Sequence, residues 1–302
     1  MPSFLISRLS ALGDVICTLP VASSLKAAFP DARITWAVDP RSAGIVDCAD
    51  DVDEVVRTKP GLSPSTWPAY AERFDAILEM QGLLKSALAT VKAKGKKRVG
   101  YHWQREFSSL FSQRVLPDTT SHHIVDQYVD VARAVGGGEE AAFRLTPKEE
   151  DLNKCSALLG SAKVLINPGA AWATKRWPPE HIAALMRMLD GEGIGCALIG
   201  APDEKESHEE ILKNAPGHTL AGQTSVRELV ALTSLAKAHI GGDTGTTHLA
   251  AALGIPAIGL YSITNPRRSC PYGQIDRCHY NSAGLNQIEP EAVYRTVMEA
   301  LS

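Results

Sequence analysis

Short apolar segments alternate with helix-like segments along the whole chain, and this alternation runs through it twice. Predicted strands in the first half are 3–7, 34–38, 52–57 and 76–79, with helical patterns over 11–28 and 83–93. Those in the second half are 164–167, 196–200, 218–221, 239–241 and 257–261, with helices over 179–189, 203–214, 226–236 and 246–253. Strands that alternate with helices of this length favour parallel sheets built from βαβ units. The sequence therefore predicts an α/β fold with two open domains.

A chain of 302 residues is long enough for two such domains. The favoured boundary lies between the glycines 136–138 and Lys163, and we divide the chain into 1–150 and 151–288. Open α/β domains bind ligands beyond the carboxyl ends of their strands. With two such domains facing one another, we expect the site in a central cleft.

Charge and hydropathy exclude several classes of protein. The 31 Lys and Arg residues nearly balance the 34 Asp and Glu residues, which argues against a nucleic-acid partner. No segment reaches the roughly 20 apolar residues of a membrane span, and the N-terminus lacks the pattern of a signal peptide. We therefore expect a cytoplasmic protein. Six cysteines are scattered through the chain, and the spacing of Cys270 and Cys278 matches no common zinc site.

The first of four notable loops, residues 7–14, follows the first predicted strand. Gly13 permits a close backbone approach, and Asp14 stands near a helix N-terminus. An Asp at this place caps a helix in many proteins, which is one interpretation. The other is a carboxylate that takes a proton from a substrate hydroxyl.

The second loop, residues 167–178, contains a hydroxyl beside two cations, Thr174, Lys175 and Arg176. Its composition suits an anionic group, although it lacks the glycine spacing of a P-loop. The alternative is a solvated basic pair between two tryptophans.

The third loop, residues 241–248, directly precedes an apolar helix. Its glycines allow backbone amides to point outward, and a helix N-terminus attracts phosphate oxygens. Thr244 and Thr246 add hydroxyl donors, and Asp243 can accept from sugar hydroxyls. A well-capped helix with a partly buried His248 is the alternative. In the fourth loop, Asp203 or Glu204 either holds a ribose or caps its helix.

One basic cluster stands out, with Lys or Arg at 92, 94, 96, 97 and 98. Such a run is usually a solvated face. The alternative is attraction to an anionic acceptor or to an anionic membrane surface.

Four segments together resemble the ADP-heptose:lipopolysaccharide heptosyltransferases, glycosyltransferase family 9. They are 10–15 (SALGDV), 169–178 (GAAWATKRWP), 243–249 (DTGTTHL) and 79–87 (EMQGLLKSA), the last similar to the heptosyltransferase I branch. The resemblance implies a GT-B fold of two Rossmann-like domains. It also implies that the first domain binds the acceptor, that the second binds the nucleotide sugar, and that 289–302 packs back on the first domain.

The resemblance implies a role for each matching residue. Asp14 is the general base, Thr174 and Lys175 contact the diphosphate, Glu204 the ribose and Asp243 the sugar, Thr244, Gly245 and Thr246 hold phosphate oxygens, His248 lies behind them, and Lys85 and Arg105 lie near the acceptor's anionic groups. The partners are an ADP-sugar and an anionic glycolipid, with peripheral contact at the inner membrane surface. No carboxylate cluster resembles a divalent-cation site, so we predict inverting transfer without metal or cofactor.

Two departures leave the acceptor and the sugar open. The stretch 265–270, which includes Arg267, Arg268 and Cys270, differs from the glycine-rich segment usual in the family, and the basic run is not typical of it. The alternatives are a nucleotide-sugar epimerase of the same fold and a non-catalytic nucleotide-binding protein. A dinucleotide-dependent dehydrogenase is disfavoured because no G-x-G-x-x-G follows the first strand of either half.

Overall fold

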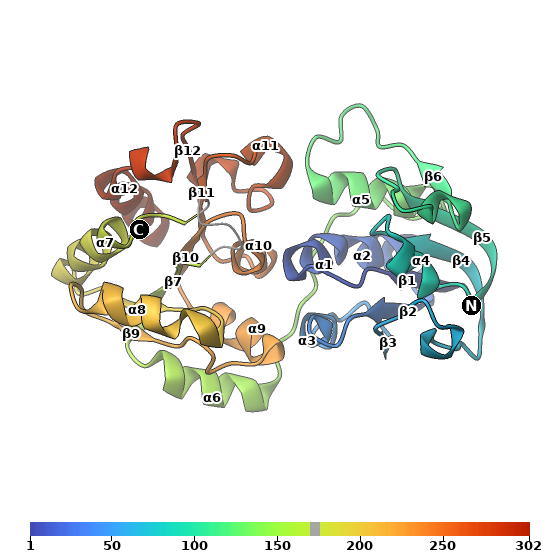
Figure 1. Cartoon of the computed structure of the whole chain (residues 1–302), viewed down its shortest axis with the longest axis horizontal. Helices are drawn as coiled ribbons and strands as arrows, with labels where there is room; N and C mark the ends of the chain where they lie inside the picture. The colour runs from blue at the N-terminus through green and yellow to red at the C-terminus, as the bar shows by residue number, and fades with distance from the viewer. Residues whose placement is uncertain (170–175) are drawn as a thin grey trace. The chain divides into compact units, whose positions relative to one another are not determined.

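The computed structural model describes residues 1–169 and 176–302 (Figure 1). The chain divides into two compact units, Met1–Thr146 and Pro147–Ser302. A boundary after residue 150, as predicted, would fall inside the helix α6 (Glu149–Leu159). The observed division precedes this helix, because domain boundaries fall in linkers that few contacts cross.

The first unit is built on a six-stranded sheet in the order β3-β2-β1-β4-β5-β6, in which all paired strands are parallel. The strands are β1 (Ser3–Ser7), β2 (Arg33–Val38), β3 (Glu54–Arg57), β4 (Arg73–Glu79), β5 (Lys94–Tyr101) and β6 (Gln113–Val115). Leu5, Ile6 and Trp36 of the central strands are fully buried. Strands buried on both faces read as continuous apolar runs, which is why the sequence revealed the central ones.

Helices and short 3₁₀ turns connect these strands. They are α1 (Leu12–Thr18), α2 (Pro20–Ala28), α3 (Ala43–Val46), η1 (Pro64–Thr66), α4 (Leu84–Leu88), η2 (Ser108–Leu110) and α5 (Ile124–Arg133). The single helix predicted over 11–28 is two helices, because Pro20 occupies the first position of α2. Proline lacks the N–H that a continuous helix needs at this point but suits a helix start.

The strand β5 was not predicted, because its first half is the basic run. Side chains alternate along a strand, so Lys94, Lys96 and Arg98 share one face and Lys97 lies on the other. The neighbouring β6 pairs only with Val99–Tyr101, so the basic half of β5 has a neighbour on one side alone, in β4. Charged side chains are typical of such exposed strand edges.

The second unit contains another six-stranded sheet, in the order β12-β11-β10-β7-β8-β9, and its paired strands are also parallel. The strands are β7 (Ala162–Asn167), β8 (Gly195–Leu198), β9 (His218–Thr219), β10 (Ala238–Gly241), β11 (Ala257–Tyr261) and β12 (Cys278–Tyr280). The connecting elements, besides α6, are α7 (Pro179–Gly191), η4 (Pro202–Glu204), α8 (Lys205–Leu212), α9 (Val226–Leu235), α10 (Gly245–Ala252), α11 (Pro266–Ser269), η5 (Ile275–Arg277), η6 (Leu285–Gln287) and α12 (Pro290–Leu301).

Alternate residues of the strands face opposite sides of this second sheet. Val164 and Ile166 pack with α7 and α12, whereas Leu165 packs with α6 and α9 on the other side. The apolar face of α12, which includes the fully buried Val293 and Val297, belongs to the core of this unit. The packing of 289–302 on the first domain stays a prediction, and it would have to use another face of α12. A helix buries its apolar stripe on the nearest apolar surface, and α7 with the sheet supplies that surface here.

Candidate functional site

Asp14 lies in the first turn of α1, just beyond the carboxyl end of β1. One of its carboxylate oxygens, Oδ2, lies 2.7 Å from Nη2 of Arg8 and accepts a weaker hydrogen bond, 3.3 Å, from the backbone N–H of Ala11. Among the residues that the structure describes, none donates to Oδ1. The side chain of Asp14 is 48% exposed, whereas that of Arg8 is 6% exposed. One oxygen of the Asp14 carboxylate is thus bonded to the protein, while about half of the side chain remains accessible to solvent.

Arg8 was not singled out from the sequence, although it directly follows the first strand. Its Nη1 donates to the carbonyl oxygen of Met80, and its guanidinium lies 5.3 Å from the centre of the Tyr128 ring. Burial lowers the pKa of Arg8, but Tyr128, Asp14 and Glu79 outweigh this and raise it above its ordinary value. Arg8 therefore remains a permanent cation beneath Asp14.

Glu79, the last residue of β4, is a second buried charge at this edge. Its carboxylate accepts backbone hydrogen bonds of about 3.0 Å from Gln81 and Gly82, and burial raises its pKa. The side chain of Gln81 in turn accepts from the backbone N–H of Leu9 at 3.0 Å. These bonds join the loop after β4 to the loop that contains Asp14.

Lys85 and Arg105, predicted near the acceptor, follow β4 and β5 and so stand at the same edge as Asp14. The backbone N–H of Arg105 donates to the carbonyl oxygen of Gly82 at 2.7 Å, which draws the two segments together. A third cation at this edge was missed. Arg41 follows β2 and pairs with the buried Asp39 at 3.0 Å, while its own side chain is 74% exposed.

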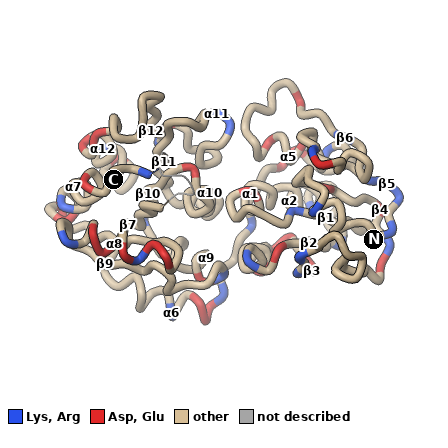
Figure 2. The backbone as a smooth tube through the Cα atoms, in the orientation of Figure 1, with Lys and Arg blue, Asp and Glu red and all other residues tan. Residues whose placement is uncertain are grey.

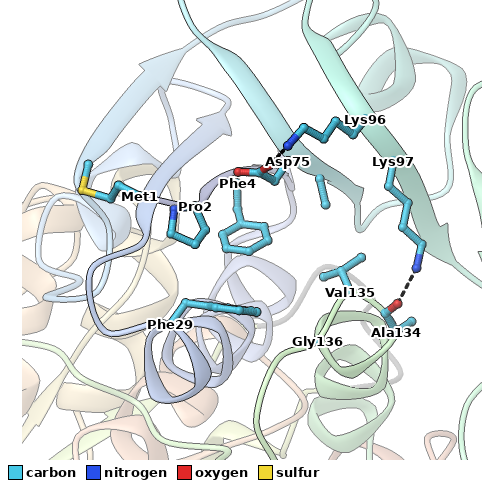
Figure 3. A pocket seen from close by; sticks show the side chains of 11 residues that line it. Met1, Pro2, Phe4, Phe29, Asp75, Lys96, Lys97, Ala134, Val135 and Gly136 are labelled. Carbon is cyan, nitrogen blue, oxygen red and sulfur yellow. Dashed lines mark hydrogen bonds and ion pairs between the residues drawn. The ribbon is translucent and has the colours of Figure 1, made fainter.

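The basic run lies at the opposite, amino edge of this sheet, where Figure 2 draws its Lys and Arg residues in blue along β5. A pocket of about 640 Å³ lies between the starts of β1, β4 and β5 and the ends of α2 and α5, and Figure 3 shows the side chains that line it. Lys96 pairs with Asp75 at 2.6 Å, and Lys97 donates to the carbonyl oxygen of Ala134 at 2.6 Å. Arg98 donates to carbonyl oxygens of Thr90 and Ala93. Much of the run therefore makes structural contacts away from Asp14.

In the second unit, hydroxyl groups gather where β7 and β10 end and α10 begins. Nδ2 of Asn167 donates to Oγ1 of Thr246 at 2.8 Å, and the Oγ1 atoms of Thr244 and Thr246 lie 3.1 Å apart. Thr244 is the N-cap of α10, and Gly245 and Thr246 form its first turn. The structure thus places these three predicted residues together at a helix N-terminus, where an anion is favoured.

Two histidines lie under this hydroxyl cluster. Nε2 of His239 lies 3.0 Å from Oγ1 of Thr246, and complete burial lowers the pKa of His239 to about 3. This imidazole is therefore uncharged at neutral pH. His248 is also buried, and its Nε2 lies 3.5 Å from Oδ1 of Asp243. Asn167 and His239 were not predicted, since a polar residue at a strand end has many structural uses.

Glu204, at the end of η4, makes the predicted capping interaction, and its contact with a ribose stays a prediction. Its Oε2 accepts from the backbone N–H of Ala201 at 2.7 Å, which is the capping interaction. Its Oε1 lies so close to Gly169 that a Cβ on that glycine would be 1.9 Å away. The carboxylate therefore lies against Gly169, and a side chain at 169 would displace it.

Other predicted features have simpler outcomes. Thr174 and Lys175 lie outside the described residues. Cys270 is buried and Cys278 half-buried, and their thiols are hydrogen-bonded neighbours, which raises the pKa of Cys278.

Residues 1–169 and 176–302 contain no group of three or more His, Cys, Asp and Glu side chains placed to hold a metal ion. Within the same ranges, no helix has both the length and the apolar composition of a membrane span.

Comparison with known proteins assigns this architecture to a class. The structure of Escherichia coli heptosyltransferase WaaC with ADP superposes with a TM-score of 0.80 at 26% identity, covering 99% of this chain and 100% of that one. The two six-stranded parallel sheets of this chain have the GT-B fold of that glycosyltransferase.

The sequence comparisons place the chain more narrowly. The profile of glycosyltransferase family 9 (heptosyltransferase) matches residues 70–299. The lipopolysaccharide core heptosyltransferase OpsX of Haemophilus influenzae is 28% identical over 91% of this chain and 83% of its own length. Lipopolysaccharide heptosyltransferase 1 of Escherichia coli K12 is 29% identical over 89% of this chain and 91% of its own. The chain belongs to glycosyltransferase family 9, the heptosyltransferases.

Proposed function

We propose that this enzyme transfers a heptose, or a similar sugar, from an ADP-sugar to an anionic glycolipid acceptor of the lipopolysaccharide inner core, with inversion at the anomeric carbon. The observation that carries the proposal is the carboxylate of Asp14, anchored through Oδ2 and open at Oδ1. The curated relatives are lipopolysaccharide heptosyltransferases, and WaaC was solved with ADP.

In the proposed reaction the acceptor hydroxyl oxygen attacks the anomeric carbon while the bond from that carbon to the diphosphate oxygen breaks. The hydroxyl proton passes to Oδ1 of Asp14, and ADP leaves with the bonding electron pair. Attack opposite the leaving group inverts the configuration. A positioned carboxylate of this kind contributes about 10²–10⁴-fold to a rate.

Arg8 is the positioning residue for Asp14 in this proposal. Its ion pair occupies Oδ2 of a side chain that is 48% exposed, which leaves Oδ1 for the acceptor hydroxyl. Buried contacts with Met80 and Tyr128 hold the guanidinium itself in place. A base held in this way is oriented before substrate arrives, which lowers the entropic cost of proton transfer.

The second unit would bind the donor. Hydroxyls of Thr244 and Thr246 and the amide of Gly245 take phosphate oxygens, and Lys175 and Thr174 complete the diphosphate contacts. Glu204 accepts from the ribose hydroxyls and Asp243 from the sugar hydroxyls. His248, 3.5 Å from Asp243, orients it from behind. Preorganised donors of this kind stabilise the charge that develops on a leaving diphosphate.

The first unit would bind the acceptor. Lys85, Arg105 and Arg41 stand at the edge that contains Asp14, and each can pair with a carboxylate or phosphate of the acceptor. We also propose that transfer needs no metal ion, because Lys175 and the start of α10 can neutralise the diphosphate. Turnover that persists in excess EDTA would support this, and turnover restored only by added Mg²⁺ or Mn²⁺ would contradict it.

The donor class is tested by thermal shift against ADP, UDP and GDP and their sugars. We expect stabilisation by ADP and ADP-heptose and little by the others. Transfer is then measured with ADP-heptose and a deacylated inner-core acceptor. Release of isomerised free sugar without acceptor would instead indicate the epimerase alternative.

A further inference from the structure

An exposed apolar segment follows β5 in the first unit. Trp103 is 50% exposed, Phe107 77%, Leu110 79% and Leu116 70%. We propose that residues 103–116, here called the apolar segment, dock the enzyme on a bilayer that contains acidic lipids. Large exposed apolar side chains that gather in one short stretch are typical of interaction surfaces.

The apolar segment is firmly held on its inner side. A Cβ on Gly82 would lie 2.2 Å from the carbonyl oxygen of Trp103, so the two backbones touch. Nε2 of Gln104 donates to Oγ of the buried Ser112 at 2.8 Å, and Oε2 of Glu106 accepts from the backbone N–H of Leu84 at 3.3 Å. The backbone of the apolar segment is therefore held in place while its apolar side chains are exposed.

The backbone turns Phe107 outward in an unusual conformation. Glu106 and Phe107 have φ angles of 53° and 63°, and they are the two non-glycine residues with positive φ in the described part of the chain. Bulky residues rarely adopt this region, and such outliers cluster at functional positions. Phe107 then caps the 3₁₀ turn η2, in which residues three apart lie on one side. The backbone N–H of Leu110 donates to the carbonyl oxygen of Phe107 at 3.0 Å, so the two exposed side chains lie one turn apart.

Trp103 and the flanking arginines fit a lipid interface. The guanidinium of Arg105 lies 5.5 Å from the Trp103 ring centre. Tryptophan prefers the headgroup level of a membrane, and arginine buries its stem while its charge stays with the headgroups. The apolar segment contains two arginines, Arg105 and Arg114, and one glutamate, Glu106, in a chain of net charge −3. Its local charge therefore complements acidic lipids.

The apolar segment lies near the loop that contains Asp14, so a membrane contact there would bring the proposed base close to a lipid-anchored acceptor. It adjoins the loop after β4 through the bond from Arg105 to Gly82, and that loop is joined to the loop of Asp14. A glycolipid anchored in the same bilayer would present its sugar near this edge. This purpose rests on the proposed function, whereas the lipid contact itself does not.

Co-sedimentation of the full chain with phosphatidylcholine–phosphatidylglycerol vesicles, without substrates, tests the proposal. We expect wild-type binding that is weaker on phosphatidylcholine alone. The double variant Phe107→Asn, Leu110→Ser should lose about tenfold or more in binding, the scale expected for losing one buried apolar side chain. Asn is chosen at position 107 because it tolerates the positive φ angle there. The matched control is Leu62→Ser, which removes an 82% exposed leucine outside the apolar segment.

Several results would overturn the proposal. They are no wild-type binding, equal loss in the Leu62→Ser control, and a double variant that binds like wild type. Equal binding to neutral vesicles would overturn the role of acidic lipids. A dimer of the wild type that the double variant abolishes would assign the surface to a second copy. Transfer to the deacylated acceptor is measured in parallel, so a failure of the proposed function appears there and a failure of docking only on vesicles.

Discussion

The carboxyl edges of the two sheets have the same topology but different chemistry. At the edge of the first sheet, charged groups pair in close contact, as in Arg8–Asp14 and Arg41–Asp39. At the edge of the second sheet, the contacts join the neutral groups of Asn167, Thr246 and His239. Ionised carboxylates suit proton transfer, whereas neutral donors at a helix N-terminus suit an incoming anion. The same fold therefore presents different side chains at its two sets of strand ends, which suits the two tasks that we propose for them.

The largest test of this difference is Asp14→Asn. The amide cannot take a proton from the acceptor, so we expect kcat to fall about 10²–10⁴-fold. The Kd for ADP, measured by calorimetry, should stay close to that of the wild type because the proposed donor contacts lie in the second unit. Asp31→Asn, which alters an exposed carboxylate elsewhere, serves as the control. Turnover unchanged by Asp14→Asn would show that Asp14 is not the base.

Arg8→Met breaks the charged network without touching the proposed base. We expect kcat to fall about 10²-fold, since small misplacements of a reacting group cost that much. The pH profile of kcat should change and the KM for donor should stay the same. Arg8→Lys should restore part of kcat because it keeps the cation. A loss of thermal stability in Arg8→Met with normal kcat in the folded enzyme would make Arg8 purely structural.

Thr246→Val probes the neutral edge. It removes one hydroxyl donor while keeping the shape, and a hydrogen bond to a charged group contributes about 1.5–3 kcal/mol. We expect ADP affinity to fall at least about tenfold by calorimetry, with a smaller effect on kcat at saturating donor. Ser234→Ala on α9 removes a hydroxyl bonded only within its own helix, to the carbonyl of Ala231, and should change neither.

Gly169→Ala sharpens the role of Glu204. The new Cβ would lie 1.9 Å from Oε1 of Glu204, so the carboxylate must move. We expect ADP affinity to fall roughly threefold to tenfold, and Glu204→Gln added to it should have little further effect, because coupled neighbours are not additive. Gly191→Ala is the matched control, since a Cβ there meets nothing within 4 Å. Additive losses of ADP affinity would show that Gly169 and Glu204 act independently.

The smallest expected effect is on stability at acidic pH. The folded-state pKa of His239 is about 3, below its ordinary value of 6.5, so below about pH 6.5 the unfolded chain takes up a proton that the folded chain excludes. Stability should therefore fall with decreasing pH, by about 1.4 kcal/mol per unit from this group. Tm measured from about pH 7 to pH 5 should fall less steeply for His239→Gln than for wild type. Parallel slopes would contradict the assignment.

The strands predicted from apolar runs match where both faces are buried, as for Ser3–Ser7 and Ala257–Tyr261. The strand β5 escaped prediction because half of it lies at an edge and is basic. Of the candidate site residues, those in local motifs were found, among them Thr244 and Thr246. Arg8, Asn167 and His239 were not found, because their contacts with Met80 and Thr246 form only when the strand ends are assembled.

Local periodicity and short motifs were enough to predict a twofold α/β chain, the ends of its central strands, and the loops that follow them. These features depend on neighbours along the chain, so they can be read from it. The tertiary structure alone decided which oxygen of Asp14 is occupied, which hydroxyls cluster before α10, and where the apolar face of α12 is buried. Those outcomes depend on the folded conformation of the loops and on how the helices pack, for which no local sequence pattern exists.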